Sequence, residues 1–238
     1  MRRRGAARLA LAGLALLATV LFVRLGLWQW QRGTAGQAQW QAFARGADTR
    51  VPLAGTSTAV PLYQRVTVTG TLDGAHQFLL DNMSFQGRPG YEVLTVLQRP
   101  GALPLVIDRG WVPFSGSRRV LPDVHLEAAG PRALTGRIAS LPSPGLELGR
   151  AAPAGEWPKV TAFPDMAELS AAYGTALEPR ILLLDAQDPA GYARAWRAPG
   201  MSPLRHFSYA IQWWTFAGLT VLVSGVLAWR ERRRRRRP

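Results

Sequence analysis

The sequence predicts a membrane protein in which an N-terminal and a C-terminal transmembrane helix flank a mainly antiparallel β (barrel- or sandwich-like) α+β external domain. Three observations predict this class. An apolar run lies near each end of the chain, and arginine clusters border both runs on the side of the termini. Between the runs, short alternating segments are separated by proline and glycine, as in many sheet proteins.

The first apolar segment covers residues 9–30, and Arg24 near its distal end is its single charged residue. At about 1.5 Å per residue, these residues span about 33 Å, enough for a hydrocarbon core of about 30 Å. Arg24 can extend its guanidinium toward the membrane surface, and Trp28 and Trp30 fit an interfacial aromatic belt. We therefore expect a transmembrane helix here.

A cleaved signal peptide is the alternative for this segment, because a basic start followed by an apolar run also matches one. The best candidate cleavage site, Ala42-Phe43-Ala44, lies about 20 residues beyond the apolar run, too far for the usual arrangement. The early arginine cluster also fits a twin-arginine signal, but only weakly. An uncleaved anchor is the preferred interpretation.

The second apolar segment covers residues 209–229 and contains no formally charged side chain. Tyr209, Trp213 and Trp214 mark its beginning and Trp229 marks its end, so aromatic residues stand at both expected interfaces. The arginine run that follows directly argues against a buried helix of a soluble core. This segment is predicted to be the second transmembrane helix.

The net charge of +14 is concentrated in two tails, residues 1–8 and 230–238. By the positive-inside rule both tails are cytoplasmic, and residues 33–205 form an external domain. That domain is periplasmic if the membrane is a bacterial inner membrane, and faces the intermembrane space in a mitochondrion. Arginines beside a membrane span are expected to contact anionic lipid and not nucleic acid.

The intervening residues are expected to form serial short strands and two helical stretches. A surface helix is expected at 164–173, where Asp165 is the N-cap and Glu168 lies three residues later. Residues 36–44 are expected to continue the first helix outward. A long loop is expected at 139–157, and an irregular segment at 191–204. The expected strands are 62–72, 77–83, 91–97, 103–112, 133–138 and 180–186.

Familiar catalytic patterns are missing. The chain has no cysteine, which excludes disulfides, thiolate catalysis and cysteine-ligated metal sites. His76, His125 and His206 are its three histidines, and no two are spaced as a helical metal pair. No nucleophile elbow or phosphate loop occurs. An enzyme is therefore not expected, although carboxylates brought together by folding remain compatible with one.

Three motifs are more specific than the rest of the sequence, and together they resemble the signatures of a known family. They are residues 25–32 (LGLWQWQR), 108–113 (DRGWVP) and 206–214 (HFSYAIQWW). The sequence resembles the surfeit locus protein 1 family, the assembly factors of haem-copper cytochrome c oxidase. The family signatures Leu-Gly-x-Trp-Gln-x-x-Arg and His-x-x-Tyr-Ala-x-x-Trp are matched at 25–32 and 206–213. In the family's Asn-Arg-Gly-Trp-Val-Pro signature, Asp108 replaces the asparagine. In the central strands, which also resemble the family, Val96 stands where proline is usual.

The resemblance implies a function in respiratory chain biogenesis. It implies a chaperone-like assembly factor, without enzyme activity, that binds or hands over haem a during maturation of oxidase subunit I. The implied partners are subunit I and the haem a synthesis machinery, and the implied cofactor is transiently held haem a. The resemblance also makes His206 the candidate ligand of the haem iron. We expect the protein to lie in the bacterial inner membrane.

The residues themselves allow such a site at the helix ends. On a helix, Tyr209 and Trp213 share a face with His206, and a neutral imidazole can ligate haem iron. Trp28 and Gln29 are expected near Trp213. The candidate cofactor-binding residues are therefore His206, Tyr209, Trp213, Trp28, Gln29 and Arg32, the last as a partner for haem propionates. Interfacial histidine and tryptophan are also common membrane anchors, which leaves that interpretation open.

The remaining motif is open to two interpretations. Arg109, Gly110, Trp111 and Pro113 are either structural, with glycine permitting a tight backbone and proline ending the strand, or they dock a partner. Two further functions also remain. One is a purely structural chaperone of the oxidase that does not ligate haem. The other is an external enzyme or ligand-binding domain, which requires a polar cleft around Asp81, Arg109 and Asp185.

Overall fold

The computed structural model of the chain describes residues 2–46, 48–127, 130–142 and 151–235. The chain divides into two compact units. One unit, Met1–Gln41 together with Pro199–Pro238, holds a pair of long helices. The other, Ala42–Ala198, holds the strands and one short helix.

The two long helices are α1 (Arg2–Arg45) and α3 (Pro203–Arg235). Each is long and apolar enough to cross a membrane, which confirms the predicted pair of candidate membrane helices. Helix α1 contains no proline and continues without interruption through residues 36–44, as expected. Helix α3 begins at Pro203. Proline suits this position because the first residues of a helix have no intrahelical acceptor for a backbone N–H, and proline has none to donate.

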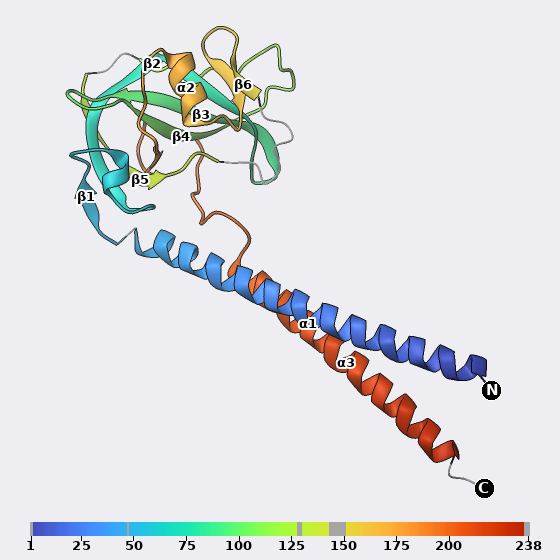
Figure 1. Cartoon of the computed structure of the whole chain (residues 1–238). Helices are drawn as coiled ribbons and strands as arrows, with labels where there is room; N and C mark the ends of the chain where they lie inside the picture. The colour runs from blue at the N-terminus through green and yellow to red at the C-terminus, as the bar shows by residue number, and fades with distance from the viewer. Residues whose placement is uncertain (1, 47, 128–129, 143–150, 236–238) are drawn as a thin grey trace. The chain divides into compact units, whose positions relative to one another are not determined.

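The helices run antiparallel, so the N- and C-termini lie at the same end of the helix pair (Figure 1). Side-chain contacts between them join residues 22–33 of α1 to residues 207–216 of α3. Toward the termini the helices splay apart (Figure 1). The pair is therefore held together over the stretch where α3 begins, far from the two termini.

The described residues of the sheet unit form eight strands in a mixed sheet. The longest strand, β2, pairs with both β3 and β5, and the pairings β3–β4, β4–β8 and β8–β5 complete a closed circuit. Most pairings are antiparallel, and β1–β2, β2–β7 and β4–β8 are parallel. The strands are β1 (Arg50–Pro52), β2 (Arg65–Phe85), β3 (Arg88–Gln98), β4 (Leu105–Pro113), β5 (Arg132–Ala139), β6 (Ala151–Ala154), β7 (Lys159–Ala162) and β8 (Ile181–Leu184).

Two predicted strands, 62–72 and 77–83, are one strand in the structure. Strand β2 begins at Arg65, three residues later than predicted, and continues through the rest of both segments. A register shift between Leu72 and Gln77 marks an irregularity in its pairing with β3. Asp73 stabilises this irregularity because its Oδ1 accepts the backbone N–H groups of Ala75 and His76 at 3.1 and 3.2 Å. The turn signals in this segment therefore mark a bulge, which bends a strand without ending it.

The connection between β2 and β3 is shorter than the sequence predicts. The residues between the expected strands 77–83 and 91–97 extend both strands and leave a tight hairpin with only Gln86 and Gly87 between them. Both residues have positive φ, 51° and 77°, as a two-residue turn that follows the twist of the strands requires. Phe85 and Arg88 consequently pair as the last residues of the ladder.

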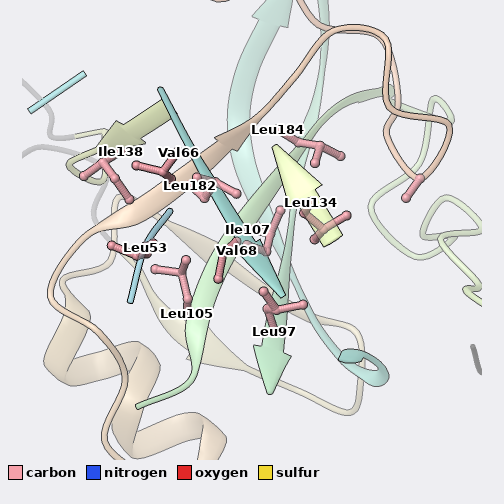
Figure 2. Close-up of a cluster of buried hydrophobic side chains, with 11 residues drawn as sticks. Leu53, Val66, Val68, Leu97, Leu105, Ile107, Leu134, Ile138, Leu182 and Leu184 are labelled. Atoms are coloured by element: carbon pink, nitrogen blue, oxygen red, sulfur yellow. The ribbon is translucent and has the colours of Figure 1, made fainter. Parts of the chain in front are cut away.

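The core lies on both faces of the strands. In β4, Leu105 and Ile107 belong to one apolar cluster and Val106 to a second, so successive residues are buried on opposite sides. The first cluster draws on β2, β3, β4, β5 and β8, which surround it (Figure 2). It consists of Leu53, Val66, Val68, Leu97, Leu105, Ile107, Leu134, Ile138, Leu182, Leu184 and Ala190.

Helix α2 (Met166–Tyr173) covers the second cluster through the buried Leu169. The predicted capping box is confirmed: Asp165 accepts from the backbone of Glu168, and the Glu168 side chain accepts from the backbone of Asp165. Gly174 ends the helix in a left-handed conformation with φ of 92°. Local sequence signals are sufficient for this element because every capping contact is made within it.

The expected long loop at 139–157 contains β6, and its residues 143–150 lie outside the described part of the chain. The sequence of β6, Ala-Ala-Pro-Ala, has neither alternation nor β-branched side chains. Pairing with β7, which itself pairs with β2, holds it in the sheet. Strand β6 therefore forms because of its pairing with β7, and its own residues do not predict it.

Candidate functional site

The contact between α1 and α3 is built on two glycines of α1. Gly26 lies against the indole of Trp214, and Gly33 lies against the ring of Phe207. A Cβ atom at residue 33 would stand 2.6 Å from Phe207 Cε1, so no larger residue fits without movement. The two glycines are seven positions apart in α1, and the two aromatic residues are seven positions apart in α3. Seven positions correspond to about two helical turns. The two aromatic side chains thus occupy the space that the glycines leave free, and so fix the register between the two helices.

An aromatic cluster surrounds these two contacts. The ring of Trp30 lies 4.8 Å from that of Phe207 and 5.7 Å from that of Trp214, measured between centroids. One turn before Gly26 in α1, Phe22 stacks on Trp213 at 5.7 Å with an interplanar angle of 24°. Such pairs add about 0.5–1.5 kcal/mol each beyond burial. The helix ends consequently present a rigid, largely apolar, aromatic surface.

A polar contact joins the first and third motifs within this surface. His206 Nδ1 lies 2.8 Å from Gln29 Oε1, and the contact is partly buried. The amide oxygen can only accept, so a hydrogen bond between these atoms requires the imidazole form that carries its hydrogen on Nδ1. In a neutral imidazole the lone pair is then on Nε2, the atom that can bind a metal ion. The two residues come from segments far apart in the sequence.

The other predicted site residues are distributed around this contact. Trp213 stacks on Phe22, whereas the sequence predicts it near Trp28 and Gln29. Trp28 is about half exposed, and the guanidinium of Arg32 lies 5.7 Å from its ring centroid. Tyr209 is also about half exposed. The structure therefore brings Gln29 to His206 and leaves Trp28, Arg32 and Tyr209 on the accessible surface.

Sequence reasoning missed the residues that set the geometry of the helix ends. They are Phe22, Gly26, Gly33, Phe207 and the contact role of Trp30. One signal was present: two glycines seven apart in one helix and two aromatic residues seven apart in the other. Small residues that admit large ones are common at helix–helix interfaces in membranes.

The second motif lies in β4, where Arg109 is buried in the sheet unit. Its Nε donates to the carbonyl of Ala190 at 2.6 Å, and its Nη1 donates to Gln77 Oε1 at 2.9 Å. Its guanidinium also lies 4.9 Å from the ring centroid of Tyr192. Burial lowers the pKa of Arg109, but the group stays charged because an arginine pKa is far above neutral. Arg109 thus ties the segment that precedes α3 in the chain to the sheet.

Gly110 allows that segment to approach the backbone of β4. Its φ is +104°, and a Cβ there would lie 2.8 Å from the carbonyl oxygen of Ala193. Tyr192 N donates to Arg109 O and Trp111 N donates to Ala193 O, both at 2.7 Å. Trp111 is buried against Phe85, and the exposed Pro113 ends the strand. These contacts are those of a structural motif.

Asp108, at the start of this motif, is paired with a second carboxyl group. It is fully buried, and its Oδ1 accepts the N–H of Gly110 at 2.9 Å. Burial, followed by the charge of Glu92 and a hydrogen bond to it, raises the pKa of Asp108 well above its ordinary value. Burial also raises the pKa of Glu92. Burial and the neighbouring Glu92 therefore both favour the neutral form of the Asp108 carboxyl group.

The remaining histidines lie in the sheet unit. His76 Nδ1 contacts Asp73 Oδ2 at 2.9 Å, and Tyr173 donates to the same oxygen at 2.9 Å. Burial and that hydrogen bond raise the pKa of Tyr173 to about 12. This cluster joins α2 to the bulge of β2. Within the described ranges, no three His, Asp or Glu side chains gather as a metal site.

The polar residues expected around an external cleft each have a different partner. Asp81 pairs with Arg118 at 2.5 Å, Asp185 pairs with Arg65, and Arg109 makes the buried contacts described above. The three therefore serve separate structural contacts.

Comparison with protein families gives a match to the SURF1 family over residues 16–218 of the 238-residue chain. The chain belongs to the SURF1 family. The match begins within α1, includes the whole sheet unit and ends within α3, so it contains all three motifs. A comparison with curated proteins found no match. Membership of the SURF1 family is consistent with a role in cytochrome c oxidase assembly.

Proposed function

We propose that this SURF1 family protein is an assembly factor that binds haem a, or hands it over, during maturation of cytochrome c oxidase subunit I. Haem a is cargo in this proposal, held transiently, and the protein is not an enzyme. The observation that carries the proposal is the partly buried imidazole of His206, held by Gln29 among aromatic rings. Family membership supplies the oxidase context.

The donor set fits a haem group. An imidazole whose Nδ1 is hydrogen-bonded would offer Nε2 to haem iron, which binds such nitrogen ligands. Aromatic side chains suit the apolar faces of a porphyrin, and Trp28 and Tyr209 are accessible for that contact. Arg32 and Arg205, in and beside the two motifs, are exposed and suit the carboxylates of the propionates.

We further propose that the protein spans a bacterial inner membrane twice, with both termini cytoplasmic and the sheet unit periplasmic. The positive-inside rule supports this orientation because the arginine clusters lie beyond both helices, toward the chain termini. The arginine tails then contact anionic lipid, and nucleic acid is not a partner. Subunit I and the haem a synthesis machinery are the proposed protein partners.

A structural chaperone without haem ligation is the second candidate. Gly218 and Gly225 favour it, because a Cβ at either position would meet no atom of the described chain within 4 Å. Helix α3 therefore has small residues that its contact with α1 does not use, and such residues suit contact with another membrane helix.

Haem content of the purified full-length protein separates the two candidates. The protein is produced in a host that makes haem a, and His206→Ala is compared with His125→Ala, which changes an exposed histidine of the sheet unit. We expect haem in the wild type and in His125→Ala and its loss in His206→Ala. Equal haem in all three proteins contradicts ligation by His206. Oxidase activity that survives His206→Ala favours the structural chaperone.

A further inference from the structure

The contact between Gln29 and His206 has a direction. Gln29 presents its amide oxygen, Oε1, to His206 Nδ1 at a distance of 2.8 Å. This oxygen has lone pairs and no hydrogen, so a hydrogen bond to it requires the neutral imidazole with its proton on Nδ1. An imidazole facing water has no such constraint and exchanges its proton between both nitrogens. The contact therefore selects one of two tautomers.

The surrounding helices hold Gln29 in this position. Gln29 lies between Gly26 and Gly33 along α1, and these glycines accommodate Trp214 and Phe207 of α3. Sliding one helix along the other would drive these aromatic rings into the backbone of α1. The contact with His206 is itself partly buried, which limits competition from water for the oxygen of Gln29. Packing thus fixes the place of residue 29 beside His206 before any ligand arrives.

We propose that Gln29 is a positioning residue that sets the tautomer and ring orientation of His206, so that Nε2 is unprotonated and directed to a metal ligand. This inference rests on the proposed function of His206 in haem binding. When a histidine binds a metal ion, a hydrogen bond from the N–H of its other ring nitrogen fixes the orientation of the ring and raises its basicity. Loss of such a partner typically weakens metal affinity about 10–100-fold.

The first test needs no haem. The full-length protein is labelled with ¹⁵N-histidine, and the ring nitrogens are observed above the ordinary imidazole pKa of about 6.5. The chain has three histidines, so His206→Gln assigns the signal. We expect the Nδ1–H tautomer for His206 in the wild type and a mixture in Gln29→Met. A wild-type His206 protonated on Nε2, or an unchanged spectrum in Gln29→Met, overturns the inference.

The second test titrates haem into three variants of the full-length protein. Gln29→Met keeps the length of the side chain and removes the acceptor, so we expect affinity to fall about 10–100-fold. Gln29→Glu keeps an acceptor and makes it charged, so we expect binding to persist with a lower haem midpoint potential, because a more basic imidazole stabilises ferric iron. Gln31→Met, at an exposed position of the same helix, is the matched control and should leave both unchanged.

The outcomes separate the inference from the proposed function. If Gln29→Met binds haem as tightly as the wild type while His206→Ala does not, the positioning role is wrong and ligation by His206 stands. If the wild type binds no haem, the proposed function fails, whereas the histidine spectrum still decides whether Gln29 sets the tautomer. An equal loss in Gln31→Met attributes the effect to helix disruption and overturns the positioning role.

Discussion

Phe207 lies against Gly33, so closely that a Cβ at residue 33 would stand 2.6 Å from the aromatic ring. Two turns along α1, Gly26 bears the same relationship to Trp214. Together these contacts determine which residues of α1 and α3 face each other. The pairing of Gln29 with His206 follows from them, because both residues lie within the same stretch of helix contact.

The first prediction concerns this register. Gly33→Leu should force Phe207 away from α1 at a cost of about 1–3 kcal/mol, the usual penalty of overpacking. We expect a lower melting temperature of the helix pair in detergent and loss of bound haem. Gly13→Leu and Gly218→Leu are matched controls, since a Cβ at either glycine would meet no described atom within 4 Å. If the controls lose haem equally, the effect is not one of register.

The second prediction concerns Arg109 and the segment that precedes α3. Arg109→Met removes the hydrogen bonds to Ala190 O and Gln77 Oε1. Gln77 Oε1 still accepts from Thr95 Oγ1, so the main cost is the loss of the donor to Ala190 O, about 1–3 kcal/mol. We expect faster hydrogen exchange at the amides of Tyr192 and Trp111, which donate across this junction. Arg119→Met, at an exposed position, is the control. Unchanged exchange in Arg109→Met would contradict a role of its side chain in holding the segment.

The third prediction concerns a buried ion pair at the end of β3. Arg99 Nη2 lies 2.5 Å from Glu178 Oε1, and Ser57 N donates to the other oxygen at 2.7 Å. Glu178→Ala leaves the Arg99 charge buried without its partner, so we expect a loss of about 3–5 kcal/mol in urea unfolding. The double variant Arg99→Met with Glu178→Leu should recover much of this loss. Failure of the double variant to recover would indicate that packing, and not charge, dominates.

The sequence was sufficient wherever the signal is local. The apolar runs predict α1 and α3, and the Asp165–Glu168 spacing predicts the start of α2, because these elements make their own backbone bonds. Interaction between distant segments was less accessible. That Gln29 meets His206 depends on the register of two helices, which two glycines and two aromatic rings set. The seven-residue spacing of the glycines and of the aromatic residues is visible in the sequence, but it does not identify which glycine faces which ring.

The strands show the same limit. Gly74 in β2 is a residue type that is typical of turns. It lies instead in a bulge of the strand, which Asp73 stabilises by local hydrogen bonds. Strand β6 depends on β7 for its pairing. The secondary structure that a glycine or a run of alanines adopts thus depends on neighbouring strands that the pattern of a single sequence does not identify.

The fourth prediction tests the orientation in the membrane. The chain has no cysteine, so single cysteines can be introduced without background labelling. We expect Ser117→Cys, at an exposed position of the sheet unit, to react with a membrane-impermeant maleimide applied to intact cells after the outer membrane is made permeable. Arg232→Cys should react only after the inner membrane is lysed. The reverse pattern would contradict the proposed topology.

The fifth prediction concerns the buried carboxyl pair. Burial and the nearby Glu92 raise the pKa of Asp108, so the folded state binds its proton more tightly than the unfolded chain, where an aspartate titrates near about 3.9. Wherever the folded state holds more protons, stability decreases as pH rises. The pair is therefore most favourable below the unfolded pKa, and its contribution is lost as pH rises toward the folded pKa.

Asp108→Asn removes this dependence with little change of shape. The asparagine oxygen can still accept the N–H of Gly110, and its amide can donate to Glu92. We expect the variant to unfold at a higher temperature than the wild type near neutral pH, and the difference to shrink toward about pH 4. Asp123→Asn, at an exposed aspartate that accepts from His125 N, should leave the pH profile unchanged. A variant less stable than the wild type at neutral pH would mean that Asp108 acts as a carboxylate, balanced by Arg194, and not as a neutral carboxyl group.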